Sequence, residues 1–321
     1  MRAETSFDTG EVSPATAPSG PFVLIANRKS GTNSRDRDAL DRACAVLGDD
    51  TRLETWDAEG GEDLGAVVAK AIDSGAGCIV AAGGDGTAMA VADALLGTGV
   101  PMGCLPLGTF NYFARGLGLS EDPEEAARAL KSATPVEIEV GTVGGHVFLN
   151  NASLGIYPAI LKERESIYAR WGRRRIMAHW SVVRTFWQFQ RPMRLHLDVD
   201  GAVHQVRSPL VFVARSAYQL ERFNLAGAEA ISDDRMAVLI GRADSRWGLF
   251  KLTWRLVTRR MRQGRDYDLL PARKLLVETT RKRALVAYDG EKRRAAAPFD
   301  FAMSGDKRLT ILLPEADPRT P

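Results

Sequence analysis

The chain has 321 residues, of which 45% are hydrophobic and 26% are charged. This length suits two globular domains, and the composition is that of a folded protein with a sizeable core, which excludes a fibrous or wholly disordered chain. The three cysteines, Cys44, Cys78 and Cys104, are scattered, so we expect neither a disulfide framework nor a cysteine-based zinc site. No secretory segment follows Met1, and we therefore expect a cytoplasmic protein.

The net charge of +3 is unevenly distributed along the chain. Residues 1–150 contain 11 Lys and Arg against 22 Asp and Glu, whereas residues 151–321 contain 32 against 18. The second half therefore favours an acidic partner. The apolar stretch 176–189 is interrupted by charge and is too short to span a membrane, so we expect contact with a membrane only at its surface.

The first half alternates between strands and helices. Residues 1–20 are polar and rich in Ser, Thr, Ala and Pro, which predicts a disordered tail. Apolar runs predict strands at 22–26, 53–56, 78–82 and 102–107, and the segments between and after them predict helices at 34–47, 64–72, 89–96 and 111–117. This order is typical of βαβ units, so we predict a doubly wound α/β nucleotide-binding domain over residues 21–135.

The pattern changes after Pro135. Alternating runs predict strands at 136–143, 147–151, 194–199, 203–206, 210–214, 236–240, 274–278, 284–288 and 309–313, with turns at Gly144-Gly145 and Asp200-Gly201. Basic helical segments interrupt them at 157–190 and 245–263. We predict an antiparallel, sandwich-like, β-rich domain over residues 136–321, which the resemblance described below makes the lipid-substrate domain, with a return of the last strand to the first domain left open.

The strongest chemical signal is a glycine-rich loop directly after the third predicted strand. It comprises Gly83, Gly84, Asp85, Gly86 and Thr87. Glycines let the backbone approach a phosphate, and the following helix presents free N–H groups and the positive end of its dipole. Asp85 would repel phosphate directly, so we expect it to act through Mg²⁺ or through hydrogen bonds to the loop or a ribose. A plain glycine-rich turn is the alternative.

This loop matches the GGDGT signature shared by NAD kinases, diacylglycerol kinases and sphingosine kinases. Further segments are similar to motifs of the lipid kinases: Asn27-Arg28-Lys29-Ser30-Gly31, Pro106-Leu107-Gly108-Thr109-Phe110-Asn111-Tyr112-Phe113-Ala114, Asn150-Asn151-Ala152-Ser153-Leu154-Gly155 and Asp289-Gly290-Glu291. In order and spacing the chain therefore resembles the soluble diacylglycerol kinase and sphingosine kinase-like lipid kinase family from about residue 22 to residue 313.

The resemblance implies an ATP-dependent lipid kinase with its active site between two domains, acting on a diacylglycerol-like or sphingoid-like hydroxyl. It implies ATP and Mg²⁺ as cofactors. It assigns nucleotide binding to Asn27, the Gly83–Thr87 loop, Thr109 and Asn111. Asp289 would be the general base, and Glu291 would assist through Mg²⁺. Judged from its residues alone, Asp289-Gly290 is more often a hairpin turn than a base.

Two positions depart from the family pattern. Tyr112 stands where the family usually has Asp. Asp233-Asp234-Arg235 is similar to the family's D-D-G segment, which implies a structural Mg²⁺ at Asp233 and Asp234, but Arg235 replaces the glycine. An arginine there could take the place of the metal, and a polar turn is the alternative.

The two basic segments carry interleaved aromatic residues. Between residues 242 and 265 there are eight Lys and Arg against Asp244, together with Trp247, Phe250 and Trp254. This mixture suits a helix lying on an anionic membrane surface, although a solvated face with core aromatics fits as well. We expect a lipid substrate at the inner membrane surface and no nucleic acid, and the sequence leaves a homodimer open. The competing functions are a NAD kinase-like phosphotransferase and a non-catalytic lipid-binding protein.

Overall fold

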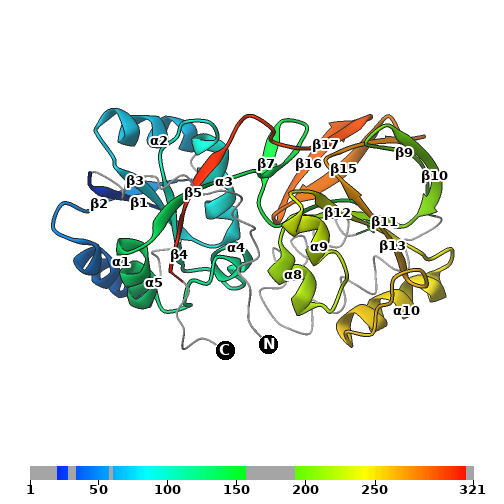
Figure 1. Cartoon of the computed structure of the whole chain (residues 1–321), viewed down its shortest axis with the longest axis horizontal. Helices are drawn as coiled ribbons and strands as arrows, with labels where there is room; N and C mark the ends of the chain where they lie inside the picture. Colours follow the sequence, from blue (N-terminus) through cyan, green and yellow to red (C-terminus); the bar gives the residue numbers. More distant parts are fainter. Residues whose placement is uncertain (1–19, 28–33, 58–60, 157–191, 316–321) are drawn as a thin grey trace. The chain divides into compact units, whose positions relative to one another are not determined.

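The computed structural model describes residues 20–27, 34–57, 61–156 and 192–315 (Figure 1). The chain divides into two compact units. Unit 1 comprises Met1–Val140 and Ser304–Pro321, and unit 2 comprises Gly141–Met303. The predicted tail, apart from Gly20, and the first basic segment, residues 157–190, lie outside the described residues.

Unit 1 is built on one mixed sheet with the strand order β2-β1-β3-β4-β18-β5. The first four strands are parallel, and β18 runs parallel to β4 and antiparallel to β5. β1 and β3 are almost wholly buried, as expected for apolar strands covered on both faces. The strands are β1 (Phe22–Asn27), β2 (Arg52–Trp56), β3 (Cys78–Gly83), β4 (Met102–Pro106), β5 (Thr134–Ile138) and β18 (Leu309–Leu313).

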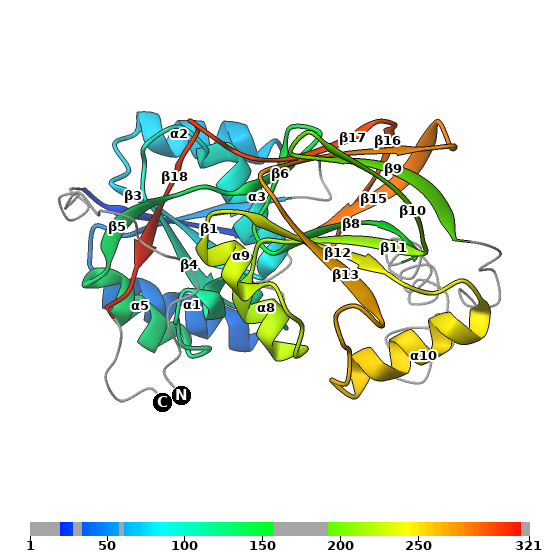
Figure 2. The same cartoon turned by 45° about the vertical axis from the view of Figure 1, so that its right-hand side comes forward.

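The helices of unit 1 cover both faces of this sheet (Figure 2). α1 packs beside α5 on one face, and α2 packs beside α3 on the other. The boundaries follow local chemistry, since the Asp122 carboxylate caps α5 by accepting the N–H groups of Glu124 and Glu125. The helices are α1 (Ser34–Leu47), α2 (Leu64–Asp73), α3 (Asp85–Leu95), α4 (Tyr112–Gly116) and α5 (Pro123–Lys131). The predicted alternation of strands and helices is confirmed.

Unit 2 contains two six-stranded antiparallel sheets. Their orders are β10-β9-β14-β17-β6-β7 and β13-β12-β11-β8-β15-β16. One core cluster joins alternate residues of both sheets, for example Leu195 and Leu197 from one and Val211 and Val213 from the other. The strands are β6 (Gly141–Val143), β7 (His146–Phe148), β8 (Asn151–Gly155), β9 (Met193–Val199), β10 (Ala202–Ser208), β11 (Leu210–Ala214), β12 (Met236–Gly241), β13 (Tyr267–Ala272), β14 (Lys274–Thr279), β15 (Arg283–Tyr288), β16 (Glu291–Ala296) and β17 (Phe299–Met303).

Three described helices cover parts of unit 2. α8 (Ala217–Arg222) and α9 (Ala228–Ser232) pack against the β11–β12 region through a second apolar cluster that includes Leu220 and Ile231. α10 (Arg246–Val257) is held by a smaller cluster around Leu249 and Leu252. The expected β-rich antiparallel arrangement with a helical insertion is therefore present. In the part of the chain that the structure describes, we find no helix with the length and apolarity needed to cross a membrane.

The structure differs from the prediction at the junction between the units. The predicted strand 136–143 is two strands, because β5 pairs with β18 in unit 1 whereas β6 pairs with β17 in unit 2. The chain therefore passes between the units after Val140 and returns at Ser304. A backbone hydrogen bond links these two residues, because the Ser304 N–H donates to the Val140 carbonyl at 2.9 Å.

Candidate active site

Three segments of unit 1 meet at one edge of its sheet. Ala26 of β1 pairs with Ala82 of β3, and Gly83 pairs with Pro106 of β4. The N–H of Leu107 then donates to the carbonyl of Gly83 at 3.0 Å. The carboxyl ends of these parallel strands consequently bring together Asn27, the Gly83–Thr87 loop and the turn that follows Pro106. Residues 28–33, which complete the first motif, lie outside the described part.

The glycines of this edge allow two backbones to touch. A Cβ on Gly108 would lie 2.4 Å from the Cα of Gly84, and a Cβ on Gly83 would lie 2.4 Å from the hydroxyl of Thr87. Neither neighbour leaves room for a larger residue. A Cβ on Gly86 would meet no atom within 4 Å. The loop is therefore tight on the sheet side and open beside Gly86.

The turn after β4 is shaped by Asn111. This residue is buried with a left-handed φ of 50°, which Asn tolerates better than most residues. Its side-chain amide accepts the N–H of Gly108 and donates to the carbonyl of Gly108, both at 2.9 Å. Asn111 is thus engaged within the turn, whereas Thr109 at the tip is exposed. Phe110 is half exposed and stacks on Tyr112 with ring centroids 5.5 Å apart.

Asp85 occupies the first position of α3. Its Oδ1 accepts the N–H of Phe113 at 3.0 Å and so ties the start of α3 to α4. The preceding residue, Gly84, makes no side-chain cap at this helix end. The first N–H groups of an α-helix lack intrahelical acceptors and carry the positive end of its dipole. With the open space beside Gly86, this end of α3 has the character of an anion site.

Asp289 lies in unit 2, in the turn between β15 and β16. Asp289 and Gly290 have φ of 44° and 92°, and Tyr288 pairs with Glu291, so these residues form a two-residue hairpin turn, while the role of Asp289 as a base stays a prediction. The Asp289 side chain is nevertheless buried. Its carboxylate accepts three consecutive backbone N–H groups, from Leu149 at 2.5 Å, Asn150 at 2.9 Å and Asn151 at 3.0 Å. Glu291 is the first residue of β16, directly after the turn, and is exposed.

A buried polar cluster continues from Asp289. The side-chain amide of Asn151 donates to Gln219 at 2.9 Å, and the N–H of Arg215 donates to the carbonyl of Asn150 at 2.8 Å. The Arg215 guanidinium is only 2% exposed and donates to the carbonyl of Ile231 and to the carboxylate of Asp234 at 3.0 Å and 2.8 Å. Arg215 and Gln219 were not predicted from the sequence, because nothing near them in the chain marks them as buried.

The segment Asp233-Asp234-Arg235 forms a polar turn after α9. Asp233 caps that helix through its backbone, and Asp234 has a left-handed φ of 53°. The Arg235 guanidinium contacts the Asp200 carboxylate at 2.8 Å. Within the described residues, no group of three or more His, Cys, Asp or Glu could hold a metal ion. A metal at Asp233 and Asp234 stays a prediction, and Arg215 is the cation that the structure places on Asp234.

The comparisons with known proteins agree with the resemblance drawn from the motifs. Residues 21–143 match the diacylglycerol kinase catalytic domain. A protein of Chromohalobacter salexigens named "Probable lipid kinase YegS-like" is 37% identical over 140 residues, which are 42% of this chain and 44% of that protein. A protein of the same name from Pseudomonas syringae pv. syringae is 39% identical over 138 residues, which are 41% and 43% of the two chains. The matches thus span less than half of these relatives.

Solved structures show the likeness over a longer part of the chain. A diacylglycerol kinase from Bacillus anthracis strain Sterne has a TM-score of 0.60 and 16% identity, covering 92% of this chain and 97% of that chain. A second structure from the same strain reaches a TM-score of 0.66 at 18% identity, covering 92% and 98%. At these identities the likeness establishes the fold. It extends through both units, well beyond the matched catalytic domain.

Proposed function

We propose that this chain, whose residues 21–143 match the diacylglycerol kinase catalytic domain, is a lipid kinase that transfers the γ-phosphoryl group of ATP to a lipid hydroxyl. The observation that carries the proposal is the sheet edge of unit 1, where the Gly83–Thr87 loop and the Gly108 turn touch and leave open space beside Gly86. The family match and the names of the similar proteins support the same class of reaction.

In this proposal the backbone of the glycine loop and the start of α3 bind the phosphates of ATP. Thr109 offers an exposed hydroxyl at the tip of the neighbouring turn, and Asn27 offers an amide at the end of β1. Asn111, which is hydrogen-bonded within its turn, acts by holding the Gly108 backbone against Gly84. Phosphoryl transfer depends mainly on such positioning and on neutralisation of charge.

Mg²⁺ would supply that neutralisation when it is bound with ATP. The described residues fit a metal that arrives on the nucleotide, because a kinase-type Mg²⁺ needs only one or two carboxylates beside phosphate oxygens and water. Asp85 is the carboxylate at the start of α3, and its Oδ1 is held in place by the Phe113 N–H. Asp85 would therefore face the metal as a positioned ligand.

Asp289 is proposed as the base that accepts the proton of the lipid hydroxyl, with Glu291 as its acidic neighbour. This role comes from the family motif. What supports it here is that the carboxylate is held by three N–H groups, which would fix its orientation and keep compensating donors around its charge. The same contacts also stabilise the hairpin, so a test must separate turnover from folding.

The nucleotide part of the proposal is tested by Gly86→Ala. The substitution places a methyl group in the open space beside the loop, and Ala is favoured over Gly within a helix by about 0.5–1 kcal/mol. We expect ATP affinity, measured by calorimetry with Mg²⁺, to fall about tenfold, corresponding to about 1.4 kcal/mol, while the melting temperature is kept or raised.

Gly108→Ala is the contrasting variant. Its Cβ would lie 2.4 Å from the Cα of Gly84, so the two loops would have to separate, and we expect losses in both melting temperature and ATP binding. Equal ATP affinity in wild type and Gly86→Ala would overturn the assignment of this edge as the phosphate site. Phosphorylation of NAD with no turnover of any lipid would instead favour the NAD kinase-like alternative.

A further inference from the structure

Helix α10 presents large apolar side chains on two faces. Leu249 and Leu252 are buried in the cluster that attaches the helix to unit 2. On another face, Trp247, Phe250, Trp254 and Val257 are 75%, 52%, 60% and 71% exposed. Their spacing of three, four and three residues places them along one side of the helix. They are four of the seven large hydrophobic residues that are exposed in the described part of the chain, so they form a patch and not a scatter.

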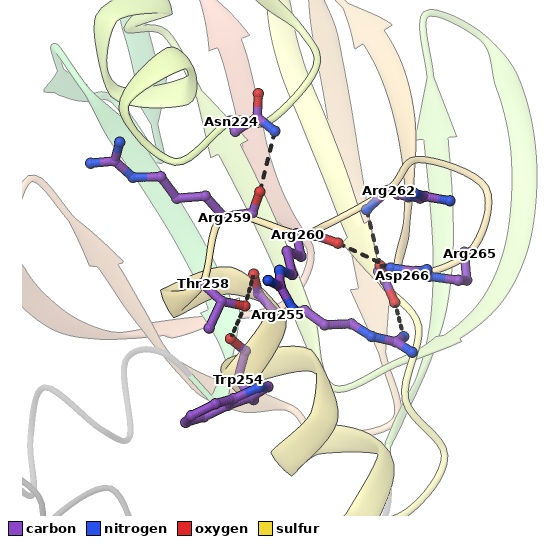
Figure 3. Close-up of polar contacts among 9 residues, drawn as sticks. All are labelled: Asn224, Trp254, Arg255, Thr258, Arg259, Arg260, Arg262, Arg265 and Asp266. Carbon is purple, nitrogen blue, oxygen red and sulfur yellow. Dashed lines mark hydrogen bonds and ion pairs between the residues drawn. The ribbon is translucent and has the colours of Figure 1, made fainter.

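A cavity of about 540 Å³ opens where this helix ends. Figure 3 shows most of the side chains around it. Five of the residues that line it are arginines, and Trp254 of the apolar stripe lines it as well. The full lining is Asn224, Trp254, Arg255, Thr258, Arg259, Arg260, Met261, Arg262 and Arg265.

The buried Asp266 carboxylate holds three arginines of this pocket in place. Its carboxylate is 2% exposed and accepts from the Arg255 guanidinium at 2.5 Å, the Arg265 guanidinium at 2.6 Å and the Arg262 N–H at 2.9 Å (Figure 3). The backbone is held too, because Asn224 donates to the carbonyl of Arg259 and Arg265 donates to that of Arg260. The pocket is therefore preorganised, because one buried carboxylate fixes two guanidinium groups and the loop between them.

Among the described residues, no acidic group pairs with the remaining positive charge of the pocket. The guanidinium groups of Arg259, Arg260 and Arg262 make no hydrogen bond or ion pair with any described residue. In the part of the chain that the structure describes, the five arginines of the pocket thus have one carboxylate partner, that of Asp266. Exposed guanidinium groups are suited to a phosphate, which they can bind with paired N–H donors.

We propose that the exposed face of α10 and the arginine pocket together form a docking surface for an anionic phospholipid membrane. The pocket would bind a phospholipid headgroup phosphate, and the stripe would enter the layer beneath it. A membrane surface offers a phosphate layer directly beside an apolar layer, and Trp254 belongs to both features of the protein. The proposal is independent of catalysis, because it concerns binding in the absence of ATP.

Sedimentation with vesicles of phosphatidylcholine, with and without phosphatidylglycerol, tests the pocket. Arg259→Ser with Arg260→Ser removes two positive charges whose guanidinium groups contact no described carboxylate. The contacts of Asp266 with Arg255, Arg262 and Arg265 stay in place. At about 1 kcal/mol for each arginine near an anionic surface, partition onto phosphatidylglycerol vesicles should fall roughly 30-fold, and wild-type binding should weaken at high salt.

The control is Arg281→Ser with Lys282→Ser, which removes the same charge from the exposed turn between β14 and β15. It should bind nearly as well as the wild type. An equal loss in both double variants would reduce the effect to net charge and overturn the pocket. Inorganic phosphate is the competitor that tests the ligand. If it released the protein from the vesicles as effectively as added phosphatidylglycerol did, the assignment of a lipid headgroup would likewise be overturned.

The apolar stripe is tested by Trp247→Ser, with Val257→Ser as a milder change. Trp247→Ser should lower vesicle partition about tenfold, since a large aromatic surface no longer enters the membrane. Val203→Ser is the matched control for Val257→Ser, because Val203 is 69% exposed on β10, away from α10 in the sequence. Unchanged vesicle binding in Trp247→Ser would overturn the proposal. A dimer in light scattering that this variant converts to a monomer would do so as well, because the stripe would then bind a second copy of the chain.

Discussion

The Asp289 carboxylate combines a proposed chemical role with a visible structural one. Its three N–H contacts join the β15–β16 turn to the start of β8, about 140 positions earlier in the chain. Replacement by Asn would disturb these contacts, because the amide NH₂ group of Asn would face an N–H donor. An unpaired buried donor costs about 1–3 kcal/mol.

We therefore predict that Asp289→Asn lowers stability by about 1–3 kcal/mol and turnover by ~10²–10⁴-fold. The measurement is the rate of phosphorylation of a short-chain, soluble lipid, well below the melting temperature, with thermal unfolding followed in parallel. Asp266→Asn is the control, since it removes another buried and hydrogen-bonded carboxylate of unit 2. If both variants lost turnover only in proportion to their stability, Asp289 would be a hairpin residue and Glu291 would be tested next.

At the scale of elements, α9 and β11 are joined by a cation of the protein itself. Arg215 follows β11 and donates to the carbonyl of Ile231 in α9 and to Asp234 just beyond it. Arg235, which replaces a glycine of the family motif, contacts Asp200 in the turn between β9 and β10. The Arg215 guanidinium therefore supplies positive charge at Asp234, where the motif implied a structural metal, whereas Arg235, expected to take the place of the metal, pairs with Asp200 instead.

We predict that a chelator leaves the melting temperature unchanged, whereas Arg215→Ala lowers stability by about 2–4 kcal/mol, because the carbonyl of Ile231 and the Asp234 carboxylate lose their donor. Thermal unfolding with and without chelator checks both statements. Arg235→Ala should cost less, since its pair with Asp200 is partly exposed. A chelator that destabilised the wild type would restore the metal at Asp233 and Asp234.

At the scale of the whole molecule, two aspartates link the stability of unit 2 to pH. Burial alone would raise the pKa of Asp200, but the N–H groups of Lys274 and Arg273 and the guanidinium of Arg235 outweigh it and lower that pKa. Burial alone would also raise the pKa of Asp266. Hydrogen bonds from Arg265, Arg262 and Arg255 outweigh burial and lower that pKa. A carboxylate with a lowered pKa stabilises the folded state above its unfolded pKa and loses that contribution as the pH falls.

We predict that the free energy of unfolding falls as the pH drops below about 4, the ordinary pKa of Asp. Asp200→Asn should be less stable at neutral pH by about 1–2 kcal/mol and should show a shallower decline in acid. Asn keeps the left-handed turn conformation, so the change removes the charge and weakens its hydrogen bonds to Arg273, Lys274 and Arg235 without straining the turn. Denaturant unfolding over a pH series measures both slopes. Asp268→Asn, which breaks an exposed pair with Arg242, should leave the slope nearly unchanged, and identical slopes in wild type and Asp200→Asn would contradict the assignment.

Local patterns were enough to determine much of this protein. Buried apolar runs ending in glycines predicted β3 and the loop after it, and Gly144-Gly145 and Asp200-Gly201 predicted two hairpin turns, because the required left-handed φ depends on the residues of the turn itself. The motifs that point to a lipid kinase are also contiguous stretches of chain. Tertiary structure alone decided the return of β18 to unit 1, the division of residues 136–143 between two sheets, the burial of Arg215 and the N–H partners of Asp289. Each of these depends on a partner far away in the sequence, and so does the difference between Leu252, which is buried, and Trp254, which is exposed two residues later on the same helix.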